Sequence, residues 1–419
     1  MSKAGRPPIA AFIRAPNAEG ARAKIDIPHA SAAAGGLAET RVAVRRWRRC
    51  LAPGAALLLS LALAGCASRP GPEALNEVAA TVSGAREVTV YVATTRQRAS
   101  PDANVFTAGR AAELSYAEFT ISIPPNHKPG NVEWPSATPD PSSAFVTVRQ
   151  RVLDRPTFEA EISRKRGGRP PDVGIFVHGY NVNFQEAVFQ MAQMTADANV
   201  DGAPIVFAWP SEGSPTGYIA DKDAVTFSRD QLVQLLTALA RKPQIGAVNV
   251  IGHSMGGWLT AEALRQLRLT GQDATIRRLN VVLAAPDIDD DVFGRQLAVI
   301  GPLNPPMTVL VSRDDAALSI SRFVADNHDR VGAVNVRDPR VAEAARKANV
   351  QVIDISSLEA ADEFKHNRFV QLAAFYPKIA SEAADGRGGL RQAGVFVFNS
   401  VGATLSAPFT FAGQAVAGP

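Results

Sequence analysis

The fold is decided by one stretch of sequence, Val248-Asn249-Val250-Ile251-Gly252-His253-Ser254-Met255-Gly256. Its first four residues are an apolar run that predicts a buried strand, and an amphipathic helix is expected over 258–267. Between them stands Gly-x-Ser-x-Gly, in the strand–turn–helix setting where this motif holds a serine on a sharp turn. The glycines remove Cβ atoms where backbone segments approach closely. Ser254 is therefore predicted to be a nucleophile. A serine that only caps the helix after a Gly-rich turn would produce the same sequence pattern.

The same alternation of strands and helices extends on both sides of the motif. Amphipathic stretches at 185–198, 228–239 and 258–267 separate a series of apolar runs. These runs lie at 173–177, 205–209, 247–251, 279–284, 307–311 and 352–355. The alternation predicts an α/β fold, with a mostly parallel sheet covered by helices on both faces. Two earlier runs, 88–92 and 119–123, have no long helix between them, so they are expected to pair antiparallel at one edge.

A serine nucleophile needs a base that removes its proton. In a strand–elbow–helix hydrolase the other two triad members follow the serine in the order acid, then histidine. Two histidines follow Ser254, at positions 328 and 366. His366 comes after the last strand-like run, which is where the catalytic histidine lies in this kind of fold. It is therefore the predicted base. His328 precedes that run and is predicted to be a surface residue.

The acid should lie just past the carboxyl end of a strand, because it must reach the histidine at that edge. Asp315 follows the run 307–311 and is the predicted acid. Asp287 and Asp314 occupy comparable positions and remain alternatives. The acidic run Asp289-Asp290-Asp291 is expected to be a solvated loop or a helix start.

Two backbone amides are predicted to form an oxyanion hole. One is the amide of Met255, which follows the nucleophile. The other is the amide of Tyr180, in the loop after the run 173–177, where Gly179 permits a close approach. His178 and His253 are expected to shape these two turns rather than to act as bases.

Five motifs together resemble one known family. They are 176–181 (Phe-Val-His-Gly-Tyr-Asn), 207–211 (Phe-Ala-Trp-Pro-Ser), 252–256, 285–289 (Ala-Pro-Asp-Ile-Asp) and 312–318 (Ser-Arg-Asp-Asp-Ala-Ala-Leu). The resemblance is to bacterial α/β-hydrolases grouped as a domain of unknown function within the esterase/lipase superfamily, and it extends from Val88 to Phe375. It implies the α/β-hydrolase fold and a serine triad, and its Ser-Arg-x-Asp pattern favours Asp315. It supplies no substrate, and Lys365 stands where a small residue is expected before the histidine.

Charge and cysteine content exclude several classes of protein. The 419 residues carry a net charge of +4, but residues 1–65 hold ten of the 44 basic and three of the 40 acidic residues, so the rest carries about −3. No basic patch remains to indicate nucleic-acid binding. The two cysteines, Cys50 and Cys66, exclude a disulfide scaffold and a cysteine-rich zinc site. No metal ion and no organic cofactor is expected.

The N-terminal region predicts export to the cell envelope. The basic cluster 45–49 and the apolar run 51–64 are typical of a signal peptide, and Leu63-Ala64-Gly65-Cys66 resembles the lipobox of bacterial lipoproteins. We expect cleavage before Cys66, its lipidation, and location in the outer membrane. Residues 1–44 are expected to be disordered or to precede the true start, near Val42 or Val44. The remaining boundaries are a signal at 45–65, a tether at 66–85, the hydrolase domain at 86–376 and a C-terminal tail at 377–419.

The sequence thus predicts a carboxylic-ester hydrolase tethered to a bacterial membrane, with a small-molecule acyl ester as its substrate. An amidase, peptidase or acyltransferase with the same triad is one alternative. A non-catalytic envelope protein that uses the fold for binding is another. The Gly- and Pro-containing segment 210–223 either covers the site or is a plain connection.

Overall fold

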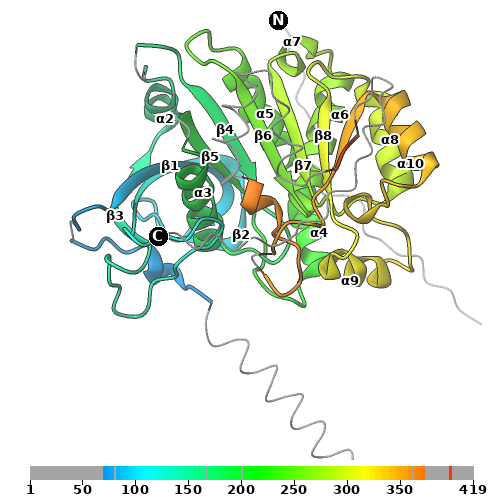
Figure 1. The fold of residues 1–419 in the computed structure, drawn as a ribbon. Helices are drawn as coiled ribbons and strands as arrows, with labels where there is room; N and C mark the ends of the chain where they lie inside the picture. The colour runs from blue at the N-terminus through cyan, green and yellow to red at the C-terminus, as the bar shows by residue number, and fades with distance from the viewer. Residues whose placement is uncertain are drawn as a thin grey trace, which may run out of the picture. The chain divides into compact units, whose positions relative to one another are not determined.

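One sheet runs through the part of the chain that this computed structural model describes, residues 69–79, 82–165, 168–199, 202–360, 362–372 and 396–398. In that part the strand order is β10-β9-β8-β7-β6-β4-β5-β1-β2-β3 (Figure 1). The strands are β1 Arg86–Arg98, β2 Phe106–Ile123, β3 Val146–Leu153, β4 Asp172–Val177, β5 Gly202–Ala208, β6 Val248–His253, β7 Leu279–Ala284, β8 Met307–Val311, β9 Val350–Asp354 and β10 Phe396–Phe398.

The centre of the sheet is parallel, as the alternation of strands and helices predicts. Every neighbouring pair from β1 through β5, β4, β6, β7 and β8 to β9 is parallel. The predicted antiparallel pair is confirmed, because Val88 of β1 lies opposite Ile121 of β2. The structure adds β3 beyond β2 and β10 beyond β9, both antiparallel.

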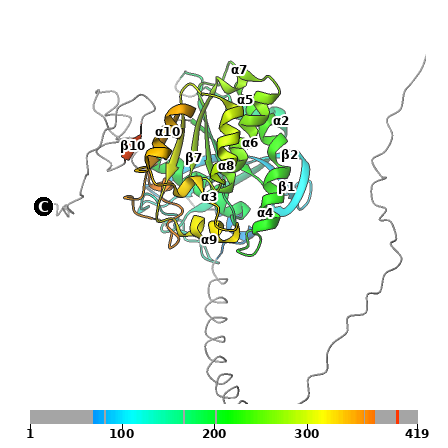
Figure 2. The same ribbon diagram turned by 90° about the vertical axis from the view of Figure 1, so that its right-hand side faces the viewer.

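Helices cover both faces of the sheet (Figures 1 and 2). The α-helices are α2 Arg155–Ile162, α3 Phe184–Ala198, α4 Tyr218–Phe227, α5 Arg229–Ala240, α6 Met255–Leu269, α7 Asp273–Ile276, α8 Asp290–Ile300, α9 Ala316–Val324 and α10 Pro339–Ala348, and the 3-10 helices are η1 Pro72–Leu75 and η2 Val331–Ala333. Successive residues of β4 enter different cores: Ile175 and Val177 pack with α5 and α6, whereas Phe176 packs with α3. No helix in the described part has the length and apolar character needed to cross a bilayer.

The parallel strands end along one edge of the sheet, which places the predicted site residues together. His178 follows β4, Ser254 follows β6, Asp315 follows β8 and His366 follows β9. In Figure 1 this carboxyl edge is the lower one, beside α4 and α9.

The predicted tether at 66–85 is wrong in part, because the chain already packs on the domain from Pro70. Leu75 in η1 is buried, and the Val78 N–H donates to the Thr147 carbonyl at 2.8 Å. Glu77 accepts the backbone N–H of Gln150 at 2.8 Å. These contacts hold residues 70–79 against β3 and α3, so the compact unit begins at Pro70 rather than at residue 86.

Several predictions fall on residues outside the described part. The extension 1–44, the signal at 45–65 and the lipidation site Cys66 lie there, as does most of the tail 377–419. In that tail the described residues 396–398 form β10, which pairs with Val352–Asp354 of β9.

Candidate active site

Ser254 stands on a strained turn between β6 and α6. Its φ of 54° and ψ of −121° lie in a region that side-chain-bearing residues rarely adopt. Hydrogen bonds fix this turn, because the Ser254 N–H donates to the Ala284 carbonyl at 3.0 Å and the Gly257 N–H donates to the Ser254 carbonyl at 2.9 Å. The predicted elbow is therefore present, and α6 begins immediately behind the serine.

Two glycines allow backbone to pack against the elbow. A Cβ on Gly256 would overlap the carbonyl oxygens of Val177 and His178. A Cβ on Gly179 would lie 2.9 Å from the Cβ of Ser254, closer than such atoms approach in proteins. The loop after β4 thus lies directly against the serine, and we define this loop, residues 178–181, as the oxyanion loop after its predicted role.

The structure brings His366 and Asp315 into contact. The Nδ1 of His366 lies 2.7 Å from Oδ2 of Asp315, whose side chain is fully buried. The other oxygen of Asp315 accepts the Leu318 N–H at 2.9 Å, because Asp315 also caps α9. A carboxylate held at both oxygens presents a fixed acceptor to the imidazole. Nδ1 therefore carries a proton, and Nε2 is left to accept one.

The charge of Asp315 governs the ionisation of His366. Burial lowers the pKa of His366, but the hydrogen bond and the charge of Asp315 outweigh it, and the net shift is upward. The ring lies beside the elbow, since the His253 and His366 ring centroids are 4.5 Å apart. His253 Nε2–H faces the His366 carbonyl at 3.3 Å. Burial lowers the pKa of His253 well below its usual value, so it stays neutral and positions the neighbouring histidine.

The unusual Lys365 before the histidine has a structural role. Its φ of 58° explains why a small residue is expected at this position. The strained turn is supported by Asp362, whose carboxylate accepts the N–H groups of His366 at 3.2 Å and Asn367 at 2.9 Å. The Lys365 ammonium pairs with Asp314 at 3.1 Å.

Asp314 pairs with Arg368 and Lys365 rather than with His366. The buried guanidinium of Arg368 binds both of its carboxylate oxygens, with one contact at 2.8 Å. Hydrogen bonds from Arg368, followed by that from Lys365, hold the pKa of Asp314 well below its usual range. Arg368 was not singled out from the sequence, because its partner lies 54 residues away.

Asp287, the other alternative acid, lies in a different buried network. It accepts the hydroxyls of Ser321 at 2.6 Å and Tyr218 at 2.9 Å, and it pairs with the guanidinium of Arg330 at 3.3 Å. Burial and the Asp287 charge raise the pKa of Tyr218 to about 12. Neither Tyr218 nor Arg330 was predicted from the sequence, and together they tie α4 to α9 at the edge of the site.

The two predicted oxyanion donors lie on segments that meet at the serine. Met255 is the first residue of α6, where N–H groups have no partner within the helix and the helix dipole favours negative charge. Tyr180 follows Gly179, the residue packed against the Ser254 Cβ. The Tyr180 hydroxyl donates to the carbonyl of Pro215 at 2.5 Å, which fixes this loop to the segment after β5.

His178 shapes the oxyanion loop from below. Its ring stacks on Trp209 with centroids 4.7 Å apart, and the Trp209 indole N–H donates to the His178 carbonyl at 2.7 Å. The His178 ring nitrogens face two carbonyl oxygens, Nε2 that of Trp209 at 3.1 Å and Nδ1 that of Gly179 at 3.0 Å. Burial, with a contribution from the charge of Arg96, lowers the pKa of His178 to about 3, so it is neutral and structural.

The segment 210–223 is a shaped loop that continues into α4. Buried Asp221 accepts the hydroxyl of Ser211 at 2.7 Å and the N–H groups of Glu212 at 2.7 Å and Asn181 at 3.2 Å. One carboxylate therefore ties this segment to the oxyanion loop.

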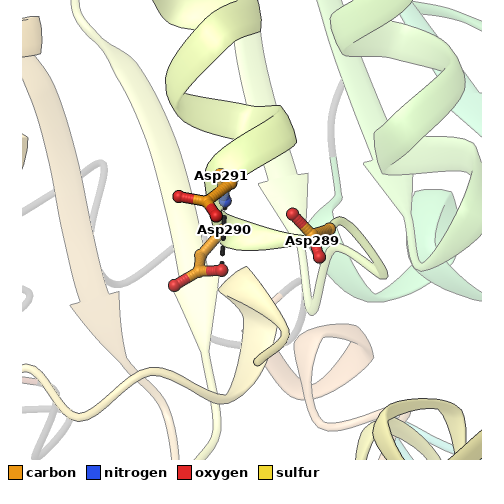
Figure 3. Close-up of side chains that lie close together, drawn as sticks. All are labelled: Asp289, Asp290 and Asp291. Atoms are coloured by element: carbon orange, nitrogen blue, oxygen red, sulfur yellow. Dashed lines mark hydrogen bonds between the residues drawn. The ribbon is translucent and has the colours of Figure 1, made fainter. Parts of the chain in front are cut away.

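The acidic run Asp289-Asp290-Asp291 forms a helix start, one of its two predicted forms. Asp289 caps α8 by accepting the Val292 N–H at 3.1 Å, and it pairs with exposed His328 at 3.2 Å. Figure 3 shows Asp290 accepting the backbone N–H of Asp291. One carboxylate oxygen from each of the three aspartates lies within 4.8 Å of the other two. Negative charge at a helix N-terminus is stabilised by the helix dipole, which accounts for the run.

Residues 156–382 match the family described as alpha/beta hydrolase of unknown function (DUF900). The chain belongs to this α/β-hydrolase family. The match spans all the residues assembled at the carboxyl edge, from the oxyanion loop to His366. The sheet topology is that of the same fold, and the family assigns the chain to the hydrolases.

Comparison with solved structures gives more distant similarities. A protein from Agrobacterium vitis S4 described as a hydrolase shares 13% identity at a TM-score of 0.27, covering 60% of this chain and 97% of its own. The α/β hydrolase MGS-M1 from a Medee basin deep-sea metagenome shares 15% identity at a TM-score of 0.27, covering 73% of this chain and 98% of its own. No curated protein matches the chain significantly.

Proposed function

We propose that this hydrolase cleaves carboxylic esters through an acyl-enzyme formed on Ser254. The observation that carries the proposal is the buried Asp315–His366 contact of 2.7 Å beside a serine with a φ of 54°. A fixed acid, a histidine whose Nε2 can accept a proton, and a serine on a strained elbow are the requirements of this chemistry.

In the first half-reaction His366 Nε2 takes the proton of the Ser254 hydroxyl as the oxygen attacks the ester carbonyl carbon. The N–H groups of Tyr180 and Met255 donate to the oxyanion that forms. His366 then passes its proton to the leaving alkoxide, the carbon–oxygen bond breaks, and an alcohol departs. The carboxylate of Asp315 stabilises the imidazolium between the two transfers.

In the second half-reaction water replaces the alcohol. His366 removes a proton from the water, whose oxygen attacks the acyl carbon of the Ser254 ester. Collapse of this intermediate returns the proton to Ser254 and releases a carboxylic acid. The cycle uses only side chains and amides of this chain.

Activity on matched substrates tests the proposal. Purified full-length protein is assayed with p-nitrophenyl acetate and butyrate and with the corresponding p-nitroanilides, beside Ser254→Ala. We expect turnover of the esters and loss of several orders of magnitude in the variant. Faster cleavage of the anilides would instead assign an amidase, and a folded parent that neither cleaves these substrates nor reacts with a fluorophosphonate would assign a binding protein.

We further propose that the mature protein begins at Cys66 and is lipid-anchored in a bacterial outer membrane. The support is the lipobox-like Leu63-Ala64-Gly65-Cys66 after a basic and apolar signal, and Ala67 rather than an acidic residue after the cysteine. More than one acyl chain is needed for stable anchoring, since each buried methylene contributes about 0.8 kcal/mol.

Mass spectrometry of protein extracted from native membranes tests the anchor. The expected N-terminal peptide starts at Cys66 and carries the added mass of acyl chains. An unmodified Cys66 would contradict the anchor, and a peptide from residues 1–41 would contradict a start near Val42 or Val44.

A further inference from the structure

Helix α9 exposes an apolar face to solvent. Ile320, Phe323 and Val324 have exposed fractions of 54%, 76% and 57%, whereas Leu318 and Ser321 on the opposite side are buried. Residues three and four apart share one face of a helix. Single exposed apolar side chains are ordinary, but a whole helix face of them indicates a contact surface.

Two more exposed apolar side chains flank α9. Ile219 of α4 is 77% exposed, and Phe364 in the loop before His366 is 52% exposed. Both segments are held to α9 by hydrogen bonds. The Ala316 N–H donates to the Phe364 carbonyl at 2.9 Å, and the Tyr218 hydroxyl lies 3.0 Å from that of Ser321. We define the apolar rim as Ile219, Ile320, Phe323, Val324 and Phe364.

The apolar rim borders the candidate active site. Helix α9 begins directly after Asp315, and Phe364 lies two residues before His366. Cations beside the rim are paired with carboxylates: Arg322 with Asp329 at 3.0 Å, and Lys365 with Asp314 at 3.1 Å. Asp326 and Glu363, which lie close to Val324 and Phe364 in the chain, are exposed, so the surroundings carry no excess of positive charge and the rim itself offers apolar contact.

The start of the compact unit lies at the same edge of the sheet. The Asn183 side-chain amide donates to the carbonyl of Pro70 at 3.0 Å, and Asn183 caps α3 three residues after Tyr180. Cys66 precedes Pro70 by four residues, which span at most about 14 Å when extended. Strands β4 and β8 stand three places apart in the sheet, a separation of about 14 Å. A lipid on Cys66 would thus tether the domain by a short segment attached at the carboxyl edge of the sheet, the edge that also carries the rim.

We propose that the carboxyl edge of this domain docks on a phospholipid surface through the apolar rim, beside the acyl chains of Cys66. The docking rests on the proposed lipid anchor and not on the proposed catalytic activity, whereas the substrate class rests on both. A lipid surface fits the rim because it accepts apolar side chains without charge complementarity. Docking turns the carboxyl edge, with Ser254 and His366, toward the membrane, so the substrates of the proposed esterase are esters that reside in the lipid phase.

Site-specific fluorescence in vesicles tests this orientation. The full-length chain is expressed in a host that processes and lipidates it, then reconstituted into phosphatidylcholine vesicles. Processing removes Cys50 and converts the Cys66 thiol to a thioether, so Phe323→Cys supplies the single reactive thiol for a polarity-sensitive fluorophore. Val324→Cys provides a second position on the same face. Leu269→Cys is the matched control, because Leu269 is 57% exposed and ends α6, whose 15 residues carry it about 22 Å from the elbow.

We expect doxyl-labelled phosphatidylcholine to quench the fluorophore at positions 323 and 324 at least twofold, in low and in 1 M salt, and to leave position 269 unaffected. The same result is expected in a Ser254→Ala background, which separates docking from catalysis. Equal quenching at all three positions, or none, would overturn the proposal. A thiol at 323 that resists labelling in detergent would assign the rim to residues 373–419 instead. Labelling of Cys66 in the parent would also overturn it, because the anchor would be missing.

Discussion

The Nδ1 of His366 lies 2.7 Å from Oδ2 of Asp315, although 51 residues separate them in the chain. The same aspartate caps α9 through its other oxygen. One buried carboxylate thus fixes the imidazole and the start of the helix that carries three of the five residues of the apolar rim. Substitutions at Asp315 are therefore expected to change chemistry and local structure together.

Replacing Asp315 should lower turnover more than replacing Asp287. Asp315→Asn is expected to lower kcat by roughly 10³–10⁴-fold, because the amide no longer favours the Nδ1–H tautomer or the imidazolium. Asp287→Asn should cost less in kcat but destabilise the fold by roughly 3 kcal/mol, since it leaves the buried Arg330 guanidinium without its counter-ion. Ester kinetics and urea unfolding of both variants check this. A larger kcat loss in Asp287→Asn would reverse the assignment.

The pH profile should report the raised pKa of His366. Its ordinary value is 6.5, and the Asp315 hydrogen bond moves it upward despite burial. The base must be neutral to accept the serine proton, so kcat/KM should fall as pH drops through a midpoint above 6.5. In Asp315→Asn the midpoint should move down. A parent midpoint below 6.5 would show that another group limits the rate.

Gly179 should tolerate no side chain, because a Cβ there would lie 2.9 Å from that of Ser254 and 2.8 Å from Nδ1 of His253. Gly179→Ala is expected to shift the oxyanion loop and lower kcat by about 10²-fold. Gly294→Ala is the matched control: it lies within α8, a Cβ there meets no atom within 4 Å, and helix propensity predicts a gain of about 1 kcal/mol. Equal activity of the two variants would exclude the close approach.

Outside the site, His127 should make stability depend on pH. Burial lowers its pKa, but hydrogen bonds to Asp197 at 2.8 Å and Glu133 at 2.7 Å raise it overall. A pKa raised on folding adds stability that is complete below the unfolded value, 6.5, and is lost as pH rises through the folded value. His127→Ala should therefore cost roughly 2 kcal/mol at pH 5.5 and clearly less at pH 9. Exposed His328→Ala, measured by the same denaturant titrations, should change little at either pH.

Much of the fold follows from local patterns. The elbow and the central strands can be predicted because strand, turn and helix signals are contiguous in the sequence. The same signals place Asp315 and His366 just past two of these strands. Strand β3 was missed although Val146, Val148 and Val152 alternate with polar residues, a period that indicates an edge strand. Helix α4 was missed because its approach is rich in Gly and Pro.

Features that depend on distant partners could not be predicted. Residues 70–79 have a linker-like composition, yet Glu77 and Leu75 tie them to β3 and the core. The Arg368–Asp314 and Arg330–Asp287 pairs likewise join segments that meet only in the folded chain. These two pairs explain why Asp314 and Asp287, the alternative acids, do not hold the histidine. Each of their carboxylates is bound to a buried arginine.

Covalent labelling with a fluorophosphonate tests the central claim most directly, because the reagent reacts preferentially with an activated serine. The full-length protein is treated, digested and analysed by mass spectrometry beside Ser254→Ala and His366→Ala, each first shown to unfold cooperatively. We predict one phosphonyl adduct, on the peptide containing Ser254, absent from Ser254→Ala and strongly slowed in His366→Ala. A folded parent protein that remains unlabelled, or an adduct on any other residue, would contradict the assignment of Ser254 as the nucleophile.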